Sequence, residues 1–247
     1  MRLLIYGYGA MGKLLCESIE DNPNLELIGA IEPRIQVEKE KVYQSLSSIG
    51  GAFDVLIDFS HPSNVLDILE HCKKHQKPVV ICTTGFDEVA DRAIQESSQQ
   101  IPILLASNTS QGINLMHQLL RKAVQALAAD FDIEIVEKHH NKKLDSPSGT
   151  ANSLLETVQN SLPNRRSVEY GRNSMKKREQ QEIGMHSLRG GTIVGEHSVI
   201  FAGEDEIIEI KHIAASKKVF AKGAIRAAQF LVKQEASLYD MEDAVSW

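Results

Sequence analysis

The chain has 247 residues, 42% hydrophobic and 24% charged, so it can bury the core of one large domain or two small ones. Its net charge of −6 argues against a protein that binds nucleic acid mainly through phosphate contacts. No apolar run approaches the roughly 18 residues of a membrane span, and residues 1–7 lack a signal-peptide pattern. Cys16, Cys72 and Cys82 make no disulfide framework, so we expect a cytoplasmic protein without nucleic-acid or membrane partners.

The first half of the chain alternates strand and helix patterns. Short apolar runs predict strands over 3–6, 25–31, 54–59, 78–82 and 103–106. Apolar residues at helical spacing predict helices over 11–20, 65–75 and 88–99. Repeated strand–helix–strand units with apolar strands favour a parallel, doubly wound sheet of the Rossmann type.

The pattern changes after residue 108. A helix is expected over about 113–129, followed by strands over 132–137, 167–170, 182–188, 196–201 and 207–212. Several of these strands alternate polar and apolar residues, which predicts an antiparallel or mixed sheet with one covered face. A last helix is expected over about 220–233. We therefore predict a dinucleotide-binding domain of residues 1–109 and 217–247, with an inserted α+β domain of residues 110–216 that binds substrate and forms oligomer contacts.

A glycine-rich turn follows the first predicted strand. It matches G-x-G-x-x-G and comprises Gly7, Tyr8, Gly9, Ala10, Met11 and Gly12. The glycines permit a tight turn, close approach of a pyrophosphate and close packing of helix on strand, while the helix start offers free N–H groups. Glu32, 20 residues after Gly12, stands where a carboxylate binds the ribose of a dinucleotide. We expect NADH, NADPH or both, because Arg34, Lys39 and Lys41 lie just beyond Glu32 and offer charge to a 2′-phosphate.

Polar turns follow the later strands of the first half. In an open parallel sheet, ligands bind beyond the carboxyl ends of the strands. The candidate walls of the nicotinamide site are therefore Cys82, Thr83 and Thr84 after one strand, and Ala106, Ser107, Asn108 and Thr109 after another. Each turn alone is as typical of an ordinary loop.

The segment 137–151 combines groups suited to proton transfer and anion binding. His139 and His140 are adjacent, and Lys143 follows four residues after the first histidine. A histidine can pass a proton near neutral pH. Ser148, Gly149 and Thr150 open a helix, where N–H and hydroxyl donors suit a carboxylate. A zinc site is disfavoured, because neither a cysteine nor a third histidine is near.

The surrounding segment is strongly basic. Residues 138–178 hold nine Lys and Arg but three Asp and Glu, giving 9 − 3 = +6 within a chain of net −6. One reading is a solvated loop, and the other is an electrostatic trap for a small anion.

The segment 137–151 closely resembles the signature E-x-H-H-x-x-K-x-D-x-P-S-G-T-A of the 4-hydroxy-tetrahydrodipicolinate reductases, also called dihydrodipicolinate reductases. The resemblance covers nearly the whole chain. It includes the glycine turn, segments 58–60, 83–86, 108–114, 194–197, 212–216 and 220–224, and residues 238–241.

This resemblance implies reduction of the cyclic dipicolinate intermediate of lysine and diaminopimelate biosynthesis with NADH or NADPH. It implies His139 as general acid/base, Lys143 as proton donor, and His140, Gly149 and Thr150 as ligands of the substrate's carboxylates. It assigns the glycine turn, Glu32 and the two polar turns to the cofactor, no metal, and a homotetramer.

The chain departs from the family pattern at several positions. Its glycine turn is one residue shorter than in many members, and Ser146 stands where alanine is usual. Lys217 replaces a common arginine and Cys82 a common glycine. Two other classes fit the glycine turn: a Rossmann dehydrogenase acting on an amino acid or sugar, and a non-catalytic NAD-sensing protein. Neither needs the Ser-Gly-Thr turn beside paired histidines.

Overall fold

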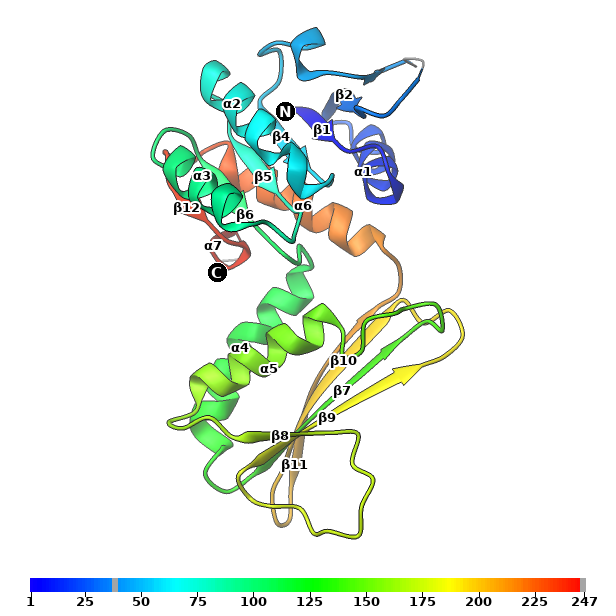
Figure 1. The fold of residues 1–247 in the computed structure, drawn as a ribbon, viewed down its shortest axis with the longest axis vertical. Coiled ribbons are helices and arrows are strands. Elements are labelled where there is room, and N and C mark those ends of the chain that lie inside the picture. Colours follow the sequence, from blue (N-terminus) through cyan, green and yellow to red (C-terminus); the bar gives the residue numbers. More distant parts are fainter. Residues whose placement is uncertain (37–39, 245–247) are drawn as a thin grey trace. The chain divides into compact units, whose positions relative to one another are not determined.

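The structure is a computed structural model that describes residues 1–36 and 40–244. The chain forms two compact units, one of Met1–Gln111 with Lys217–Trp247 and one of Gly112–Ser216 (Figure 1). The chain therefore leaves the first unit once and returns to it once.

The first unit is built on a seven-stranded parallel sheet in the order β12-β6-β5-β4-β1-β2-β3. Its strands are β1 (Arg2–Tyr6), β2 (Glu26–Ile31), β3 (Val42–Tyr43), β4 (Val55–Asp58), β5 (Val79–Ile81), β6 (Ile103–Leu105) and β12 (Leu238–Tyr239). Leu3, Leu4 and Ile5 of β1 are fully buried, as expected for a strand covered on both faces. The order reverses between β1 and β4, which marks the switch point of a doubly wound sheet.

Helices cover both faces of this sheet. They are α1 (Ala10–Glu20), α2 (Val65–His75), α3 (Glu88–Ser98), α6 (Lys218–Leu231) and α7 (Met241–Ala244), with short 3₁₀ helices η1 (Leu46–Ser48) and η2 (Pro62–Asn64). One core cluster joins α1, α6 and α7 to one face, and a second joins α2 and α3 to the other. The predicted doubly wound sheet is confirmed.

The second unit is a five-stranded mixed sheet in the order β11-β10-β7-β9-β8. The strands are β7 (Asp132–His139), β8 (Ser167–Tyr170), β9 (Glu182–Arg189), β10 (Gly195–Ala202) and β11 (Ile207–Ala214). β7 and β8 pair with β9 in parallel, whereas β10 pairs with β7 and β11 antiparallel. The predicted mixed sheet is confirmed.

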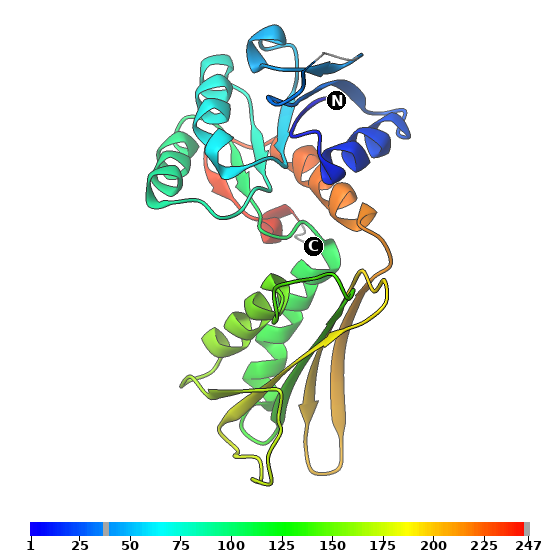
Figure 2. The same cartoon turned by 45° about the vertical axis from the view of Figure 1, so that its right-hand side comes forward.

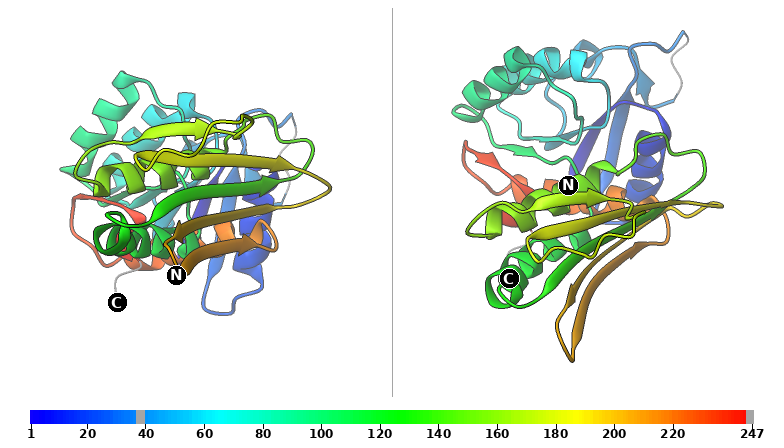
Figure 3. Two further views of the ribbon diagram at one scale, coloured as in Figure 1. Left: turned by 90° about the horizontal axis from the view of Figure 1, so that it is seen from below. Right: turned by 60° about the horizontal axis from the view of Figure 1, so that its bottom comes forward.

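Two helices, α4 (Gln111–Leu127) and α5 (Gly149–Ser161), lie on one face of this sheet (Figure 2). Their side chains share a core with Ile133, Ile135, Val199 and Phe201. The view from below in Figure 3 shows the strands on one side of the two helices. The sheet therefore has an inner face under the helices and an outer face opposite.

The predicted elements need small corrections. The strand expected over 132–137 continues to His139, which places this histidine on the strand rather than after it. The helix expected over 113–129 begins and ends two residues earlier. β3, β12, α7 and the 3₁₀ helices were not predicted, because strands of two residues and helices of three or four residues are too short to show a pattern.

Candidate active site

The inner face of the five-stranded sheet changes from apolar to polar along β7. Ile133 and Ile135 are fully buried in the core, and Glu137 and His139 continue the same face, 0% and 8% exposed. Because successive strand side chains alternate between faces, the period of two places all four residues beneath the helices. The carboxyl end of β7 thus delivers a carboxylate and an imidazole into the protein.

Strand register gathers further polar residues around Glu137. His197 of β10 lies opposite Glu137, and His212 of β11 lies opposite His197. On the other side, β9 places Ser187 opposite Glu137 and Arg189 opposite His139. One end of the inner face therefore carries a row of ionisable side chains from four strands.

Glu137 is held by hydrogen bonds from four residues. Its carboxylate accepts hydrogen bonds from both Nη atoms of Arg189, at 2.8 and 2.7 Å, and contacts Nδ1 of His139 at 2.6 Å. It also accepts the N–H of Ser148 at 3.2 Å. Burial alone would raise the pKa of Glu137, but bonds from Arg189, His139 and Ser187 outweigh it and lower the pKa to about 2.

His197 is a second buried histidine at this end of the sheet. Its ring lies 5.2 Å from that of His139 in an edge-on arrangement, and its Nε2 is 3.0 Å from Oγ of Ser148. Burial, followed by the charge of His139, lowers the pKa of His197 to about 4. His197 is therefore neutral near neutral pH, and its Nε2 shares a hydrogen bond with the hydroxyl of Ser148.

The loop from β7 to α5 carries the remaining candidates. Lys143 pairs with Asp145 at 2.8 Å, and this bond lowers the pKa of Asp145. Arg189 donates to the carbonyl oxygen of Asp145 at 2.6 Å. His140, one residue past the end of β7, is half-buried. Arg189 is thus linked to Lys143 through Asp145 and to His139 through Glu137.

Ser148 caps α5. Its hydroxyl accepts the N–H of Ala151 at 3.2 Å, and the residue is 2% exposed. Its N–H and hydroxyl therefore already have partners within the protein. Gly149 is exposed, so the donors nearest solvent at this helix start lie at Gly149 and Thr150.

In the first unit, the glycine turn meets the end of β4 at the switch point. Gly7 has φ +96°, a left-handed conformation that favours glycine, and a Cβ there would collide with the carbonyl oxygen of Phe59. A Cβ on Gly12 would collide with the carbonyl oxygen of Gly7. A Cβ on Gly9, by contrast, meets nothing within 4 Å. Gly7 and Gly12 serve packing, whereas the space beside Gly9 is open.

A cavity of about 300 Å³ lies at this point, lined by Gly7, Gly9, Glu32, Pro33, Arg34, Phe59, Ser60, His61 and Asn64. Glu32 directly follows β2, and its carboxylate accepts the N–H groups of Tyr8 and Arg34, both at 3.2 Å. No side chain caps the start of α1. The open glycine, the free helix start and the carboxylate suit the pyrophosphate and ribose of a dinucleotide.

Asp58 underlies one wall of this cavity. It is fully buried and accepts the hydroxyl of Ser60 at 2.6 Å and the N–H of Ser60 at 3.0 Å. The same N–H lies 3.0 Å from Oγ1 of Thr83. Burial raises the pKa of Asp58, although the bonds from Ser60 and Thr83 oppose this. These bonds join the turns after β4 and β5.

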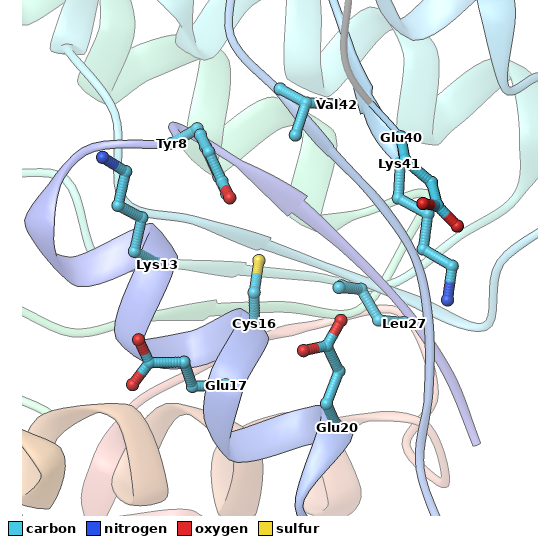
Figure 4. A pocket seen from close by; sticks show the side chains of 9 residues that line it. All are labelled: Tyr8, Lys13, Cys16, Glu17, Glu20, Leu27, Glu40, Lys41 and Val42. Atoms are coloured by element: carbon cyan, nitrogen blue, oxygen red, sulfur yellow. The ribbon is translucent and has the colours of Figure 1, made fainter.

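A second cavity, of about 360 Å³, lies between α1, β2 and β3 (Figure 4). Tyr8 lines it with Lys13, whose Nζ is 5.5 Å from the tyrosine ring, and the thiol of Cys16 lies between Tyr8 and Leu27. The side chain of Tyr8 thus faces a different cavity from Glu32. Lys41 also lines this second cavity, and Lys39 lies outside the described residues.

Most of the lysine and arginine side chains in segment 138–178 form ion pairs with acidic side chains. The ion pairs are Lys138–Glu196, Lys143–Asp145, Arg165–Glu156, Arg172–Glu182, Lys176–Glu179 and Arg178 with Asp132 and Glu134. Much of the positive charge that the segment carries in sequence is neutralised locally. This favours the solvated-loop interpretation over the anion trap.

Residues 1–36 and 40–244 hold no group of three His, Cys, Asp or Glu arranged for a metal ion. No described helix has the length and apolar character that a membrane crossing requires.

Sequence comparison decides the family. The profile described as "Dihydrodipicolinate reductase, N-terminus" matches residues 1–109, and the profile described as "Dihydrodipicolinate reductase, C-terminus" matches residues 112–245. This chain belongs to the dihydrodipicolinate reductase family. The predicted family resemblance is confirmed, and the chain is a pyridine-nucleotide-dependent reductase.

Individual relatives agree over the full length. A 4-hydroxy-tetrahydrodipicolinate reductase of Brachyspira hyodysenteriae is 46% identical, with 100% of each chain covered. One from Exiguobacterium sibiricum is 49% identical, with 98% of this chain and 95% of the relative covered. A dipicolinate-bound dihydrodipicolinate reductase from Paenisporosarcina sp. TG-14 has the same fold, with a TM-score of 0.83 at 22% identity and 98% of both chains covered.

The structure brings some of the predicted cofactor residues together and not others. Gly7, Gly9 and Glu32 line one cavity. The side chains of Cys82, Ala106 and Thr109 are buried, and burial raises the pKa of the Cys82 thiol. Thr109 donates its hydroxyl to the carbonyl oxygen of Phe220 at 2.8 Å. Thr84 and Ser107 are exposed.

Sequence reasoning gave no role to Glu137, Arg189 or His197. Glu137 and His197 stand inside the motifs that carry the resemblance, but their position on the inner face follows only from the period of β7 and β10. Arg189 belongs to no motif. Its place beside His139 depends on the pairing of β7 with β9, which the sequence does not reveal.

Proposed function

We propose that this chain reduces 4-hydroxy-tetrahydrodipicolinate to tetrahydrodipicolinate with NADH or NADPH, in lysine and diaminopimelate biosynthesis. The observation that carries the proposal is the polar end of the inner sheet face. There His139 is bound to a buried carboxylate, and a loop with Lys143 leads into the donor-rich start of α5. Relatives bearing this activity's name are 46% and 49% identical.

The reaction adds a hydride and a proton to the ring and releases water, so the protein must supply a proton and grip two carboxylates. His139 acts as general acid/base and Lys143 as proton donor. His140 and the N–H groups at Gly149 and Thr150 bind carboxylates, while Ser148 caps the helix that presents them. The bound nicotinamide supplies the hydride.

The residues at the switch point fit a dinucleotide. Gly9 leaves room for the pyrophosphate beside the free start of α1, and Glu32 binds ribose hydroxyls. Thr83, Thr84 and residues 106–109 complete the nicotinamide side. Ala10, Met11 and Gly12 contribute backbone at the start of α1.

Both coenzymes are expected to serve. Glu32 repels a 2′-phosphate, whereas Arg34 lines the same cavity and attracts one. NADH should therefore not be worse than NADPH by more than about tenfold in kcat/KM, which corresponds to roughly 1.4 kcal/mol. Side-by-side kinetics measure this ratio, and strict dependence on NADPH would contradict the role of Glu32.

A homotetramer in the cytoplasm, without nucleic-acid or membrane partners, completes the proposal. The three cysteines are free thiols, in keeping with a reducing compartment. The substrate-binding unit also has an outer sheet face on which Leu188, Ile207 and Ile213 are exposed, in keeping with contact between copies.

A spectrophotometric assay separates the proposal from the other classes. NAD(P)H oxidation is followed with freshly prepared substrate, and with amino acids or sugars as alternative substrates. Turnover with the dipicolinate intermediate alone supports the proposal. Turnover only with an amino acid or sugar indicates another dehydrogenase, and coenzyme binding without any turnover indicates an NAD-sensing protein.

A further inference from the structure

Building on the proposed function, we infer that Arg189 is a positioning residue for this reaction. Its guanidinium fixes the imidazole of His139 through Glu137 and the loop that carries Lys143 through Asp145. Arg189 lies at the end of β9, opposite His139 in the sheet, and its side chain is 19% exposed.

Arg189 determines the charge of Glu137. The two Nη atoms of Arg189 bind the two carboxylate oxygens separately, at 2.8 and 2.7 Å. Such a fork-to-fork pair is the strong form of the arginine–carboxylate bond. A fully buried carboxyl without it would favour the neutral form. Arg189 therefore keeps Glu137 ionised.

The ionised Glu137 in turn determines which nitrogen of His139 carries the proton. An ionised carboxylate has only acceptor oxygens, so in the 2.6 Å contact with Glu137 the proton belongs to Nδ1 of His139. The reactive nitrogen is then Nε2. A Cβ on Gly195 would lie 3.1 Å from this atom, so glycine there keeps a side chain away from Nε2. A buried carboxylate that fixes the tautomer of a catalytic histidine is a recurring arrangement in enzymes.

Arg189 is also linked to Lys143. The same Nη2 that binds Glu137 donates to the carbonyl oxygen of Asp145 at 2.6 Å. The side chain of Asp145 in turn holds Nζ of Lys143 at 2.8 Å. One guanidinium thus sets the separation of the two groups that handle protons.

The geometry disfavours direct binding of substrate by Arg189, because its Nη–H donors are already bonded to acceptors within the protein. Nη1 binds Glu137 and the carbonyl oxygen of Leu188, and Nη2 binds Glu137 and the carbonyl oxygen of Asp145. All four Nη protons therefore have acceptors within the protein. The remaining Nε is buried, with no acceptor among the described residues. Arg189 accordingly acts through Glu137 and Asp145.

The first test observes the tautomer directly, without substrate or coenzyme. Nitrogen-15 NMR of the imidazoles should show His139 with its proton on Nδ1 above neutral pH. Arg189→Met should give a mixture of tautomers, because Glu137 loses its counter-charge. Arg189→Lys, which keeps the charge, should retain the Nδ1 tautomer. An unchanged tautomer in Arg189→Met would overturn the inference.

Arg178 provides a matched control. Its side chain is 18% exposed and also bridges acids and carbonyl oxygens on this sheet, namely Asp132, Glu134, Ile133 and Glu182. Arg178→Met should lower thermal stability while leaving the His139 tautomer and kcat unchanged. A purely structural role of Arg189 predicts that the two methionine variants behave alike.

The second test is a pair of double-mutant cycles. Arg189→Met alone should lower kcat about 10²-fold, as misplacing catalytic groups does, and leave the Kd of NADH unchanged. Combined with His139→Gln or with Lys143→Ala, its effect should shrink by at least about tenfold, because residues acting as a unit are not additive. Fully multiplicative losses would overturn the inference. Arg189→Gln, which also removes the charge but stays polar, replaces Arg189→Met in these cycles if the methionine variant does not fold.

The two tests separate this inference from the proposed function. The NMR experiment needs no turnover, so it reports on Arg189 whatever the substrate is. A wild-type protein inactive on the dipicolinate intermediate, yet with the expected tautomer change in Arg189→Met, would refute the proposed function and retain the coupling of Arg189 to His139.

Discussion

His139 and His140 are neighbours in sequence, yet their surroundings differ. His139 ends β7 on the inner face, is 8% exposed and is bound to Glu137, whereas His140 lies beyond the strand and is half-buried. We therefore predict that His139→Gln lowers kcat by about 10²–10⁴, the size of a general acid–base contribution. Lys143→Ala should do the same. His140→Gln should raise KM more than it lowers kcat, because a ground-state contact is lost.

Steady-state kinetics and fluorescence titration of NADH together check this prediction. Coenzyme binding should survive in all three variants, since the glycine turn belongs to the other unit of the chain. A Lys143→Ala variant with near-wild-type kcat but lost NADH binding would assign the basic loop to the coenzyme instead.

For single residues, the sequence predicts which side chains are candidates for the site better than it predicts which other side chains they contact. The residues of segment 137–151 marked its histidines and Lys143 as candidates, and the family resemblance selected His139 and Lys143 for proton transfer. The sequence did not predict that the hydroxyl of Ser148 contacts His197, because His197 lies on a strand 49 residues away. Arg189 shows the same limit, since its contact with Glu137 depends on sheet pairing.

At the scale of an element, the start of α1 offers a matched pair of glycines. Gly9 has φ −76°, and a Cβ there meets nothing within 4 Å, so Gly9→Ala should leave the thermal unfolding temperature unchanged. It should raise the Kd of NADH at least about tenfold, because the methyl group occupies the approach of the pyrophosphate.

Gly12→Ala should behave in the opposite way. Its Cβ would collide with the carbonyl oxygen of Gly7, so we expect a loss of about 1–3 kcal/mol in the free energy of unfolding. Calorimetry and NADH titration on both variants make the comparison. Equal NADH affinity in Gly9→Ala and the wild type would contradict the placement of the pyrophosphate.

Helices of several turns and fully buried apolar strands were predictable, and two-residue edge strands were not. The buried strands β1, β4 and β5 and the helices α1 to α3 fall within one or two residues of their predicted bounds. β3 and β12 have two residues each and exist because neighbouring strands offer hydrogen bonds at the sheet edges. Such pairing is a tertiary property that local sequence does not encode.

At the scale of the whole molecule, two buried groups make stability fall in acid. The folded state keeps His197 neutral, with a pKa of about 4 against an ordinary 6.5, so unfolding takes up a proton as pH falls through this window. Glu137, with a pKa of about 2 against 4.5, does the same between those values. Each shift corresponds to about 3 kcal/mol.

Urea unfolding from neutral pH to about pH 3 separates the two contributions. His197→Gln should reduce the loss of stability between pH 6.5 and about 4, and Glu137→Gln should reduce the loss below pH 4.5. Both variants are less stable than the wild type at neutral pH. An unchanged slope in His197→Gln would show that this histidine is not held neutral in the folded protein.

The outer face of the five-stranded sheet is the candidate contact between copies of the chain. Ile207, Ile213 and Leu188 are 69%, 58% and 49% exposed, and register places all three opposite residues of that face rather than of the core. If copies of the chain bury this face against one another, Ile213→Glu should reduce the assembly mass measured by light scattering. Val89→Glu, at a 66% exposed site on α3, should not. A tetramer that persists in Ile213→Glu would place the contact between copies elsewhere, because a carboxylate desolvated without a partner costs several kcal/mol.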